Sequence, residues 1–222
     1  MSDQNQSPAP RHMGTKRILS LALLAGLAAG ALGVYVMETR SGNETAGSCP
    51  ARAALAAALD GTARGEVAAM RPLEAPFDVS SLAFKDTNGA ATTIGAMRGQ
   101  SLLVNLWATW CAPCRAEMPA LDELEREAGD ESFAVVPINV DMGDDAGPRG
   151  FYRETGLRSL PYFRDETMGV FNDLKRSGTA LGLPVTLLVD AEGCARAAMN
   201  GPAEWASPDG IRLIDALKGG GA

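Results

Sequence analysis

Residues 102–119 read LLVNLWATWCAPCRAEMP, and this stretch decides the fold. It opens with a short, mostly apolar run, Leu102–Leu106, which is typical of a buried strand. Over 113–128 the pattern changes, because apolar residues recur at helical spacing and charged residues occupy the opposite face. The cysteines of the CAPC motif, Cys111 and Cys114, therefore lie where a buried strand passes into the start of a helix.

This position favours a redox role for the pair over half of a metal site or a plain structural disulfide. The thiolate is the reactive form of cysteine, and a helix N-terminus presents unpaired N–H groups and partial positive charge that stabilise it. We therefore expect Cys111 to have a lowered pKa and to be the exposed attacking thiol. Cys114 lies one turn further in and is expected to be buried and to resolve the mixed disulfide. Pro113 suits the first helical turn.

The rest of the chain alternates strands and helices. Further strands are expected at 82–86, 133–140, 185–190 and 194–199, and further helices at 148–155, 166–176 and 207–217. Strands joined by helices imply a parallel core, and a hairpin at 191–193 adds an antiparallel edge. The predicted class is therefore α/β, with a central mixed β-sheet flanked by helices. An alanine-rich helical segment, 49–70, comes first and is expected to be interrupted near Asp60-Gly61, and RPLEAP at 71–76 is expected to break it.

The N-terminal part of the chain predicts a membrane anchor. Ile18–Met37 contains no charged residue and is long enough to cross a bilayer as a helix. Basic residues directly before it favour a cytoplasmic N-terminus. A cleaved signal peptide is the alternative, because small residues crowd 28–33. The expected organisation is a tail (1–17), a transmembrane anchor (18–37), a linker (38–48), an N-terminal helical extension (49–76) and a catalytic domain (77–222).

In either case residues beyond Met37 face the far side of the membrane, which in a bacterium is the periplasm. Disulfides persist in that oxidising compartment. Cys49 and Cys194 could form a second redox relay, or a structural disulfide that fixes the N-terminal helix to the sheet. No CxxC surrounds either residue, so we favour the structural disulfide.

Other classes of function fit less well. The net charge is −7, and the acidic excess lies beyond residue 40, so no basic face for nucleic acid is expected. Only one cysteine pair has the spacing of metal ligands, and the sole histidine, His12, falls on the cytoplasmic side. We expect no metal and no cofactor.

WCAPC after LLVNLWAT, followed by RAEMP and later by GLPVTLLVD, resembles the thioredoxin superfamily, and within it the membrane-anchored TlpA/ResA/CcmG-like reductases. The resemblance covers about residues 77–217 and is nearest to the TlpA branch, in which a similar extra cysteine pair occurs. It implies a thioredoxin-like fold and thiol–disulfide exchange. It also implies that Cys111 is the attacking cysteine and Cys114 the resolving one.

The resemblance assigns auxiliary roles to neighbouring residues. Pro184 matches the cis-proline that packs against the active disulfide, and Leu183 before it would offer backbone hydrogen bonds to a substrate. Trp110 is expected to line the substrate surface. Asn105 takes the place of thioredoxin's buried aspartate. Glu117 matches the active-site glutamate of the ResA-like branch, although a solvated residue of the first helical turn is the alternative.

The direction of transfer and the partners also follow only from the resemblance. It implies reduction of disulfides in copper chaperones or in the copper-binding subunit during cytochrome oxidase biogenesis. Reduction of apocytochrome c in cytochrome c maturation is the alternative. A transmembrane thiol carrier of the CcdA/DsbD type would supply electrons. A client-binding module without turnover is the alternative of another class.

Overall fold

The computed structural model describes residues 49–220. The predicted tail, anchor and linker (1–17, 18–37 and 38–48) lie outside these residues. Within 49–220 no helix is both long enough and apolar enough to cross a membrane.

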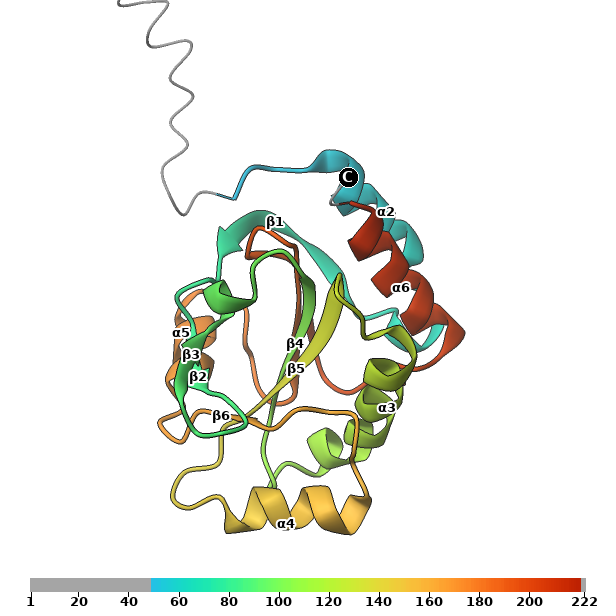
Figure 1. Cartoon of the computed structure of the whole chain (residues 1–222). Coiled ribbons are helices and arrows are strands. Elements are labelled where there is room, and N and C mark those ends of the chain that lie inside the picture. Colours follow the sequence, from blue (N-terminus) through green and yellow to red (C-terminus); the bar gives the residue numbers. More distant parts are fainter. Residues whose placement is uncertain (1–48, 221–222) are drawn as a thin grey trace, which may run out of the picture. The chain divides into compact units, whose positions relative to one another are not determined.

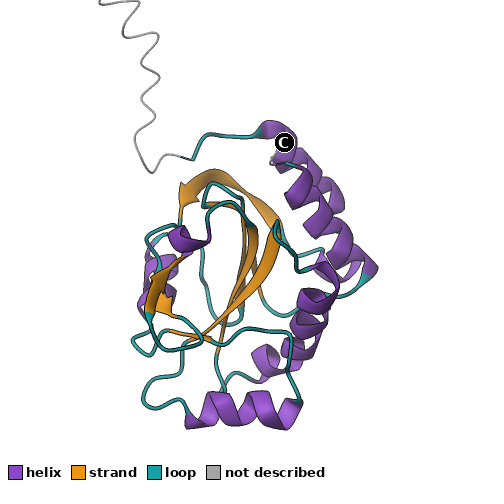
Figure 2. Cartoon of the chain, viewed as in Figure 1, coloured by secondary structure: helices purple, strands orange, loops and turns teal. Residues whose placement is uncertain are grey.

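One eight-stranded mixed sheet forms the centre of the domain (Figures 1 and 2). Its strands in chain order are β1 (Arg71–Asp78), β2 (Ala83–Lys85), β3 (Ala91–Thr93), β4 (Ser101–Trp107), β5 (Phe133–Asn139), β6 (Phe163–Arg164), β7 (Val185–Val189) and β8 (Cys194–Asn200). Their order across the sheet is β1-β8-β7-β4-β5-β6-β2-β3. The pairs β4–β5 and β5–β6 are parallel, whereas β4–β7 and β7–β8 are antiparallel. The predicted α/β class, parallel core and late hairpin are confirmed.

The helices are α2 (Ala53–Thr62), α3 (Ala112–Ala128), α4 (Ala146–Thr155), α5 (Gly169–Arg176) and α6 (Pro208–Gly219), with short 3₁₀ turns η1 (Gly65–Val67) and η2 (Ile94–Met97). Helices α2 and α6 pack side by side, and α3 contacts α6 on the same side of the sheet (Figure 1). Helix α6 begins where predicted, because the Ser207 side chain accepts a hydrogen bond from the Gly210 N–H at 3.1 Å.

Two expectations for the N-terminal region are wrong. The alanine-rich segment is helical only over α2, and it continues through the expected interruption near Asp60. RPLEAP does not merely break the helix, because it forms most of β1, which pairs with β8 and extends the sheet across the expected boundary at residue 77. Strand β1 is an edge strand, and its pairing shifts between Pro72 and Phe77. Prolines are tolerated there because an edge strand need not use every N–H.

The core is continuous across the sheet and positions the cysteine motif. Every residue of β4 and of β7 is buried, and the apolar face of α3 packs against them through Met118, Leu121 and Leu124. Because β4 is buried along its whole length, the turn that follows it has a fixed position at one end of the sheet. That end lies at the bottom of Figure 1, where α3 begins.

A candidate redox site at the start of a helix

Cys111 and Cys114 form a disulfide at the predicted junction between strand and helix. Cys111 is the N-cap of α3, and its sulfur accepts a hydrogen bond from the Cys114 N–H at 3.2 Å. Cys111 is the more accessible of the two, at 6% exposed against 0% for Cys114. The predicted order of accessibility is therefore confirmed, although Cys111 is far less exposed than expected in this oxidised form. The first-turn N–H groups of α3 favour a thiolate at Cys111 once the disulfide is reduced.

The segment before β7 lies beside this turn. The Leu183–Pro184 peptide bond is cis, as the resemblance implied. Leu106 at the end of β4 pairs with Val185 at the start of β7, so Pro184 is placed at the active end of the sheet. The loop is held from β8, because the Gly201 N–H donates to the Pro184 carbonyl at 2.9 Å and the Leu181 N–H donates to Asn200 Oδ1 at 2.8 Å.

Asp141 is a residue of this site that the sequence reasoning missed. Its carboxylate accepts hydrogen bonds from the Thr109 N–H at 3.0 Å and from the Thr109 hydroxyl at 3.1 Å. Asn139 Nδ2 donates to the same carboxylate at 2.8 Å. Asp141 therefore holds the turn before Cys111 against the end of β5. The sequence signal that could have identified Asp141 is a polar residue directly after a predicted buried strand.

Glu117 is a buried residue of α3, one helical turn beyond Cys114. Its side chain is 2% exposed, so the alternative of a solvated residue is wrong. Asn105 Nδ2 donates to Oε1 at 2.9 Å, while Trp205 Nε1 at 2.8 Å and the Ala203 N–H at 3.2 Å donate to Oε2. Burial raises the pKa of Glu117 to about 7, although these three donors oppose the shift. A carboxyl group with such a pKa can take up and release a proton near neutral pH.

Asn105 links this carboxyl group to the strand after the cis-proline. Its Nδ2 also donates to Thr186 Oγ1 at 2.9 Å. Its Oδ1 is buried and has no hydrogen-bond partner among the described residues. A half-rotation of the carboxamide would turn that oxygen toward Glu117. Asn105 can therefore donate a hydrogen bond to ionised Glu117 or accept one from protonated Glu117.

Trp205 comes from the segment between β8 and α6, and no motif or periodicity in the sequence indicates its role. It is fully buried. The first turn of α6 lies close to the backbone of Trp205. This approach requires glycine at position 210, because a Cβ there would lie 2.1 Å from the Trp205 carbonyl oxygen.

The loops at the disulfide end of the sheet carry an apolar rim, which consists of Trp110, Met142 and Leu181. Three large hydrophobic side chains of residues 49–220 are exposed: Trp110 at 65%, Met142 at 73% and Leu181 at 80%. Trp110 precedes Cys111, Met142 follows Asp141, and Leu181 lies in the loop before Pro184. Trp107, in contrast, is completely buried. Exposed apolar side chains gathered around a reactive group indicate a surface that contacts another molecule.

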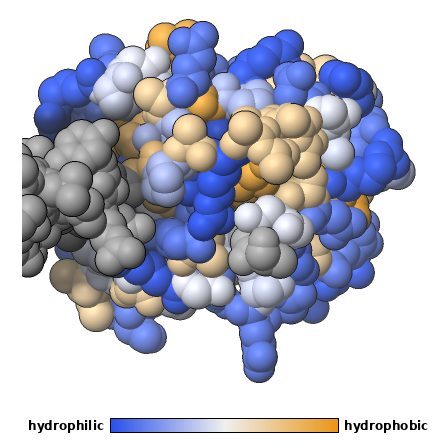
Figure 3. Space-filling model, turned by 90° about the horizontal axis from the view of Figure 1, so that it is seen from above, coloured by the Kyte–Doolittle hydropathy of each residue, from blue (hydrophilic) through white to orange (hydrophobic). Residues whose placement is uncertain are grey.

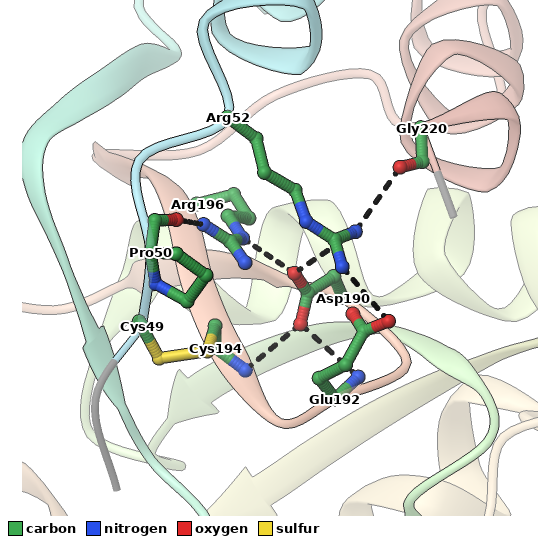
Figure 4. A network of polar contacts seen from close by, with 8 residues as sticks. All are labelled: Cys49, Pro50, Arg52, Asp190, Glu192, Cys194, Arg196 and Gly220. Atoms are coloured by element: carbon green, nitrogen blue, oxygen red, sulfur yellow. Dashed lines mark hydrogen bonds and ion pairs between the residues drawn. A yellow bond between two sulfur atoms is a disulfide. The ribbon is translucent and has the colours of Figure 1, made fainter. Parts of the chain in front are cut away.

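The second disulfide joins Cys49 to Cys194, as the structural interpretation predicted. Figure 4 shows the network around it. The Asp190 carboxylate accepts hydrogen bonds from the Cys194 N–H at 3.0 Å and from buried Arg196. Arg196 also donates to the Pro50 carbonyl at 2.6 Å, and Arg52 contacts Glu192 at 2.9 Å and the Gly220 carbonyl at 3.1 Å. The start of the described chain is thereby fixed to both β8 and the end of α6.

The two disulfides lie at opposite ends of the sheet. Leu102, at the start of β4, pairs with Val189, near Cys194, whereas the active turn follows the end of β4. The seven residues of β4 span about 20 Å at roughly 3.3 Å per residue. Direct thiol–disulfide exchange requires sulfur atoms in contact, so the folded chain does not allow a direct relay between the pairs. Figure 3 views the domain from above Figure 1, the end opposite the start of α3, where hydrophilic residues predominate around smaller hydrophobic areas.

Within residues 49–220 no group of three or more potential ligands is placed to hold a metal ion.

Comparisons with known proteins agree with a redox site. Residues 73–210 match the Redoxin family. The chain is 30% identical over 112 residues to the thioredoxin-like protein YneN of Bacillus subtilis, covering 49% of this chain and 61% of that protein. It is 27% identical over 116 residues to the thiol-disulfide oxidoreductase ResA of the same organism, covering 52% and 62%.

The match therefore spans about three-fifths of the length of these two relatives. Among solved structures, one described as a thiol:disulfide interchange protein DsbE from Chlorobium tepidum superposes with a TM-score of 0.53 at 19% identity. That superposition covers 63% of this chain and 95% of the other. It supports the fold.

Proposed function

The chain belongs to the Redoxin family, and from that premise we propose that it is a thiol–disulfide oxidoreductase that reduces disulfides in client proteins. The observation that carries the proposal is the disulfide between Cys111 and Cys114 at the start of α3. The apolar rim of Trp110, Met142 and Leu181 supports a protein client, because it offers contact area around the reactive pair.

In the proposed reaction the reduced Cys111 thiolate attacks a client disulfide. One client sulfur leaves as a thiolate and the other joins Cys111 in a mixed disulfide. Cys114 then loses its proton to Glu117 and attacks the Cys111 sulfur. The client leaves as a dithiol and the Cys111–Cys114 disulfide forms, so two electrons pass from this chain to the client.

The proposed clients are copper chaperones or the copper-binding subunit of cytochrome oxidase, which must be dithiols to accept copper. Apocytochrome c is the alternative client. A transmembrane thiol carrier of the CcdA/DsbD type would re-reduce the pair. The proposed location is the bacterial inner membrane, with a single N-terminal span at 18–37 and the described domain in the periplasm. These assignments rest on the sequence resemblance.

The test is a redox titration of the full chain with thiol trapping and mass spectrometry. A reductase is expected to titrate at Cys111–Cys114 below about −200 mV, while Cys49–Cys194 stays oxidised. A potential near −120 mV, roughly that of a strong oxidant, would reverse the direction and remove the argument for copper-binding clients.

A client-binding module without turnover is tested with two variants. Cys114→Ser should trap clients on Cys111 as mixed disulfides, and mass spectrometry of the trapped species should separate copper-binding proteins from apocytochrome c. Cys111→Ser should trap none. If client maturation in cells survives both variants, the exchange mechanism is wrong and binding alone is the function.

A further inference from the structure

A notch of about 220 Å³ opens beside Glu117 and has no part in the reaction as described so far. Its lining comes from three elements that are distant in sequence: Glu66 of η1, Ala116 and Glu117 of α3, and Pro202, Ala203 and Glu204 after β8. Glu66, Ala116, Pro202 and Glu204 are exposed, whereas Ala203 and Glu117 are buried. The notch therefore leads from solvent to a carboxyl group that is otherwise enclosed.

The other sides of Glu117 are closed by the groups that bind it. Asn105 and Trp205 donate to its two oxygens, and each is 0% exposed. The titratable groups that share the notch are Glu66 and Glu204, and no lysine, arginine or histidine of the described residues lines it. Water in the notch would thus meet one buried acid and two surface carboxylates, which can accept and pass on protons.

Such a route would serve the resolving step while a client is docked. When a client is bound to Cys111, it covers the rim around the disulfide, and Cys114 must still lose a proton before it can attack. None of the rim residues Trp110, Met142 and Leu181 lines the notch. The notch and the rim therefore share no residue, and a path through the notch would not pass between the rim side chains.

We propose that the notch is the proton channel of the site, through which Glu117 exchanges protons with solvent while a client occupies the rim. This inference rests on the proposed function. In the resolving step Cys114–SH transfers its proton to the Glu117 carboxylate, and the Cys114 thiolate displaces the client from Cys111. Protonated Glu117 then releases its proton to water in the notch, and the departing client thiolate takes up a proton from solvent. The balance of protons and electrons is complete.

Ala116→Leu fills the notch without touching a hydrogen bond of Glu117, and Ala116→Met is a second, more flexible filling variant. Ala57→Leu is the matched control, because Ala57 is an exposed alanine on another helix, α2. Glu66→Gln with Glu204→Gln removes the two mouth carboxylates and leaves the opening in place.

The first readout is hydrogen–deuterium exchange of the Glu117 carboxyl group in the oxidised full chain, followed by infrared difference spectra against Glu117→Gln at about pH 6. Both filling variants should slow this exchange about tenfold or more, whereas Ala57→Leu should exchange like the unmodified chain. The double glutamine variant should not slow exchange as the filling variants do. Exchange at the unmodified rate in both filling variants overturns the channel.

The second readout is a single turnover of the reduced chain with a disulfide-linked peptide. At about pH 6 most of Glu117 holds a proton, and this proton must leave through the notch before Cys114 can pass on its own. At that pH, filling the notch should slow resolution by Cys114 about fivefold or more and leave attack by Cys111 within about twofold. Equal rates of resolution in the filled and unmodified chains overturn the proposal. If the unmodified chain shows no attack at all, the proposed function fails, and the exchange measurement on oxidised protein still decides the channel.

Discussion

The two disulfides share one domain and one sheet, yet their surroundings differ in kind. Accessibility does not separate them, because Cys111 is 6% exposed and Cys194 is 4% exposed. The Cys111–Cys114 bond closes a separation of 3 positions, whereas the Cys49–Cys194 bond closes one of 145. The first pair has a buried titratable acid one helical turn beyond Cys114 and an apolar rim on the loops at its end of the sheet. The second is enclosed by a network of ion pairs and backbone contacts (Figure 4).

The neighbours of a disulfide, rather than the bond itself, therefore indicate its role. A redox pair needs a stabilised thiolate, a proton acceptor and a surface for its partner. A structural pair needs a long loop to close and neighbours that keep its two ends in place. A change at one disulfide should therefore leave the properties of the other unchanged.

The largest expected effect on stability comes from replacing both Cys49 and Cys194 with alanine. The variant loses the constraint on a 145-residue separation, which lowers the free energy of unfolding by about 4–5 kcal/mol in the chain-entropy treatment. Urea unfolding measures this loss. Client reduction at low temperature, where the variant stays folded, should remain within about twofold of the unmodified rate. A folded variant that has lost exchange would make this pair part of the redox machinery.

Asp190→Asn tests the network around the same disulfide. Asp190 is 1% exposed and Arg196 is 4% exposed, so the change leaves a buried guanidinium without its charge partner. Breaking such a pair lowers the free energy of unfolding by about 3–5 kcal/mol. Asp173→Asn is the matched control, because Asp173 pairs with Arg176 at the surface and should contribute about 0–1 kcal/mol. Equal effects of the two changes would show that the buried network does not hold the N-terminal segment.

Much of the redox end could be predicted from the sequence because its signals are local. The change from strand to helix pattern within 102–128 places Cys111 at a helix start, and the structure has the N-cap there. Strands β4, β5, β7 and β8 could be predicted because each is a short apolar run between turn residues. The predicted Glu166–Arg176 helix begins only at Gly169, because Asp165 binds the backbone N–H groups of Thr167 and Val170 and holds a turn there.

Contacts between distant segments could not be predicted. Trp205 meets Glu117 across a separation of 88 positions, and Arg196 meets the Pro50 carbonyl across 146. No periodicity connects such residues, because tertiary packing alone brings them together. Strand β1 was missed for a related reason, since two prolines hide a strand that exists only because β8 offers it an edge.

The third prediction concerns the dependence of stability on pH, which Glu117 alone should set at the redox end. Its pKa in the folded chain is about 7, above the ordinary value of 4.5. The folded chain thus keeps a proton that the unfolded chain releases between these values. The stabilisation is complete below about pH 4.5 and is lost as pH rises through about 7, by on the order of 3 kcal/mol. Urea unfolding of the oxidised chain at about pH 5 and pH 8 measures the loss.

Glu117→Gln is the control for this prediction, because glutamine keeps the shape of the side chain and does not titrate. The variant should lack this part of the pH dependence, whatever its stability at one pH. Parallel pH profiles for the two chains would mean that Glu117 does not hold a proton near neutral pH. Its proposed part in resolving the mixed disulfide would then fall as well.

The smallest expected effect is that of Trp110→Ala at the rim. Trp110 is 65% exposed, so its removal should change the free energy of unfolding by only about 0.5 kcal/mol. If the rim binds clients, the KM for a protein disulfide such as that of insulin should rise by about five- to tenfold, which is roughly 1 kcal/mol. Reduction of a small disulfide such as oxidised glutathione should change much less, because it is too small to contact the whole rim. Met142→Ala, on a different loop, should raise the same KM in the same direction. An equal loss with the small and the protein disulfide would show instead that Trp110 positions Cys111, and the rim would no longer support a protein client.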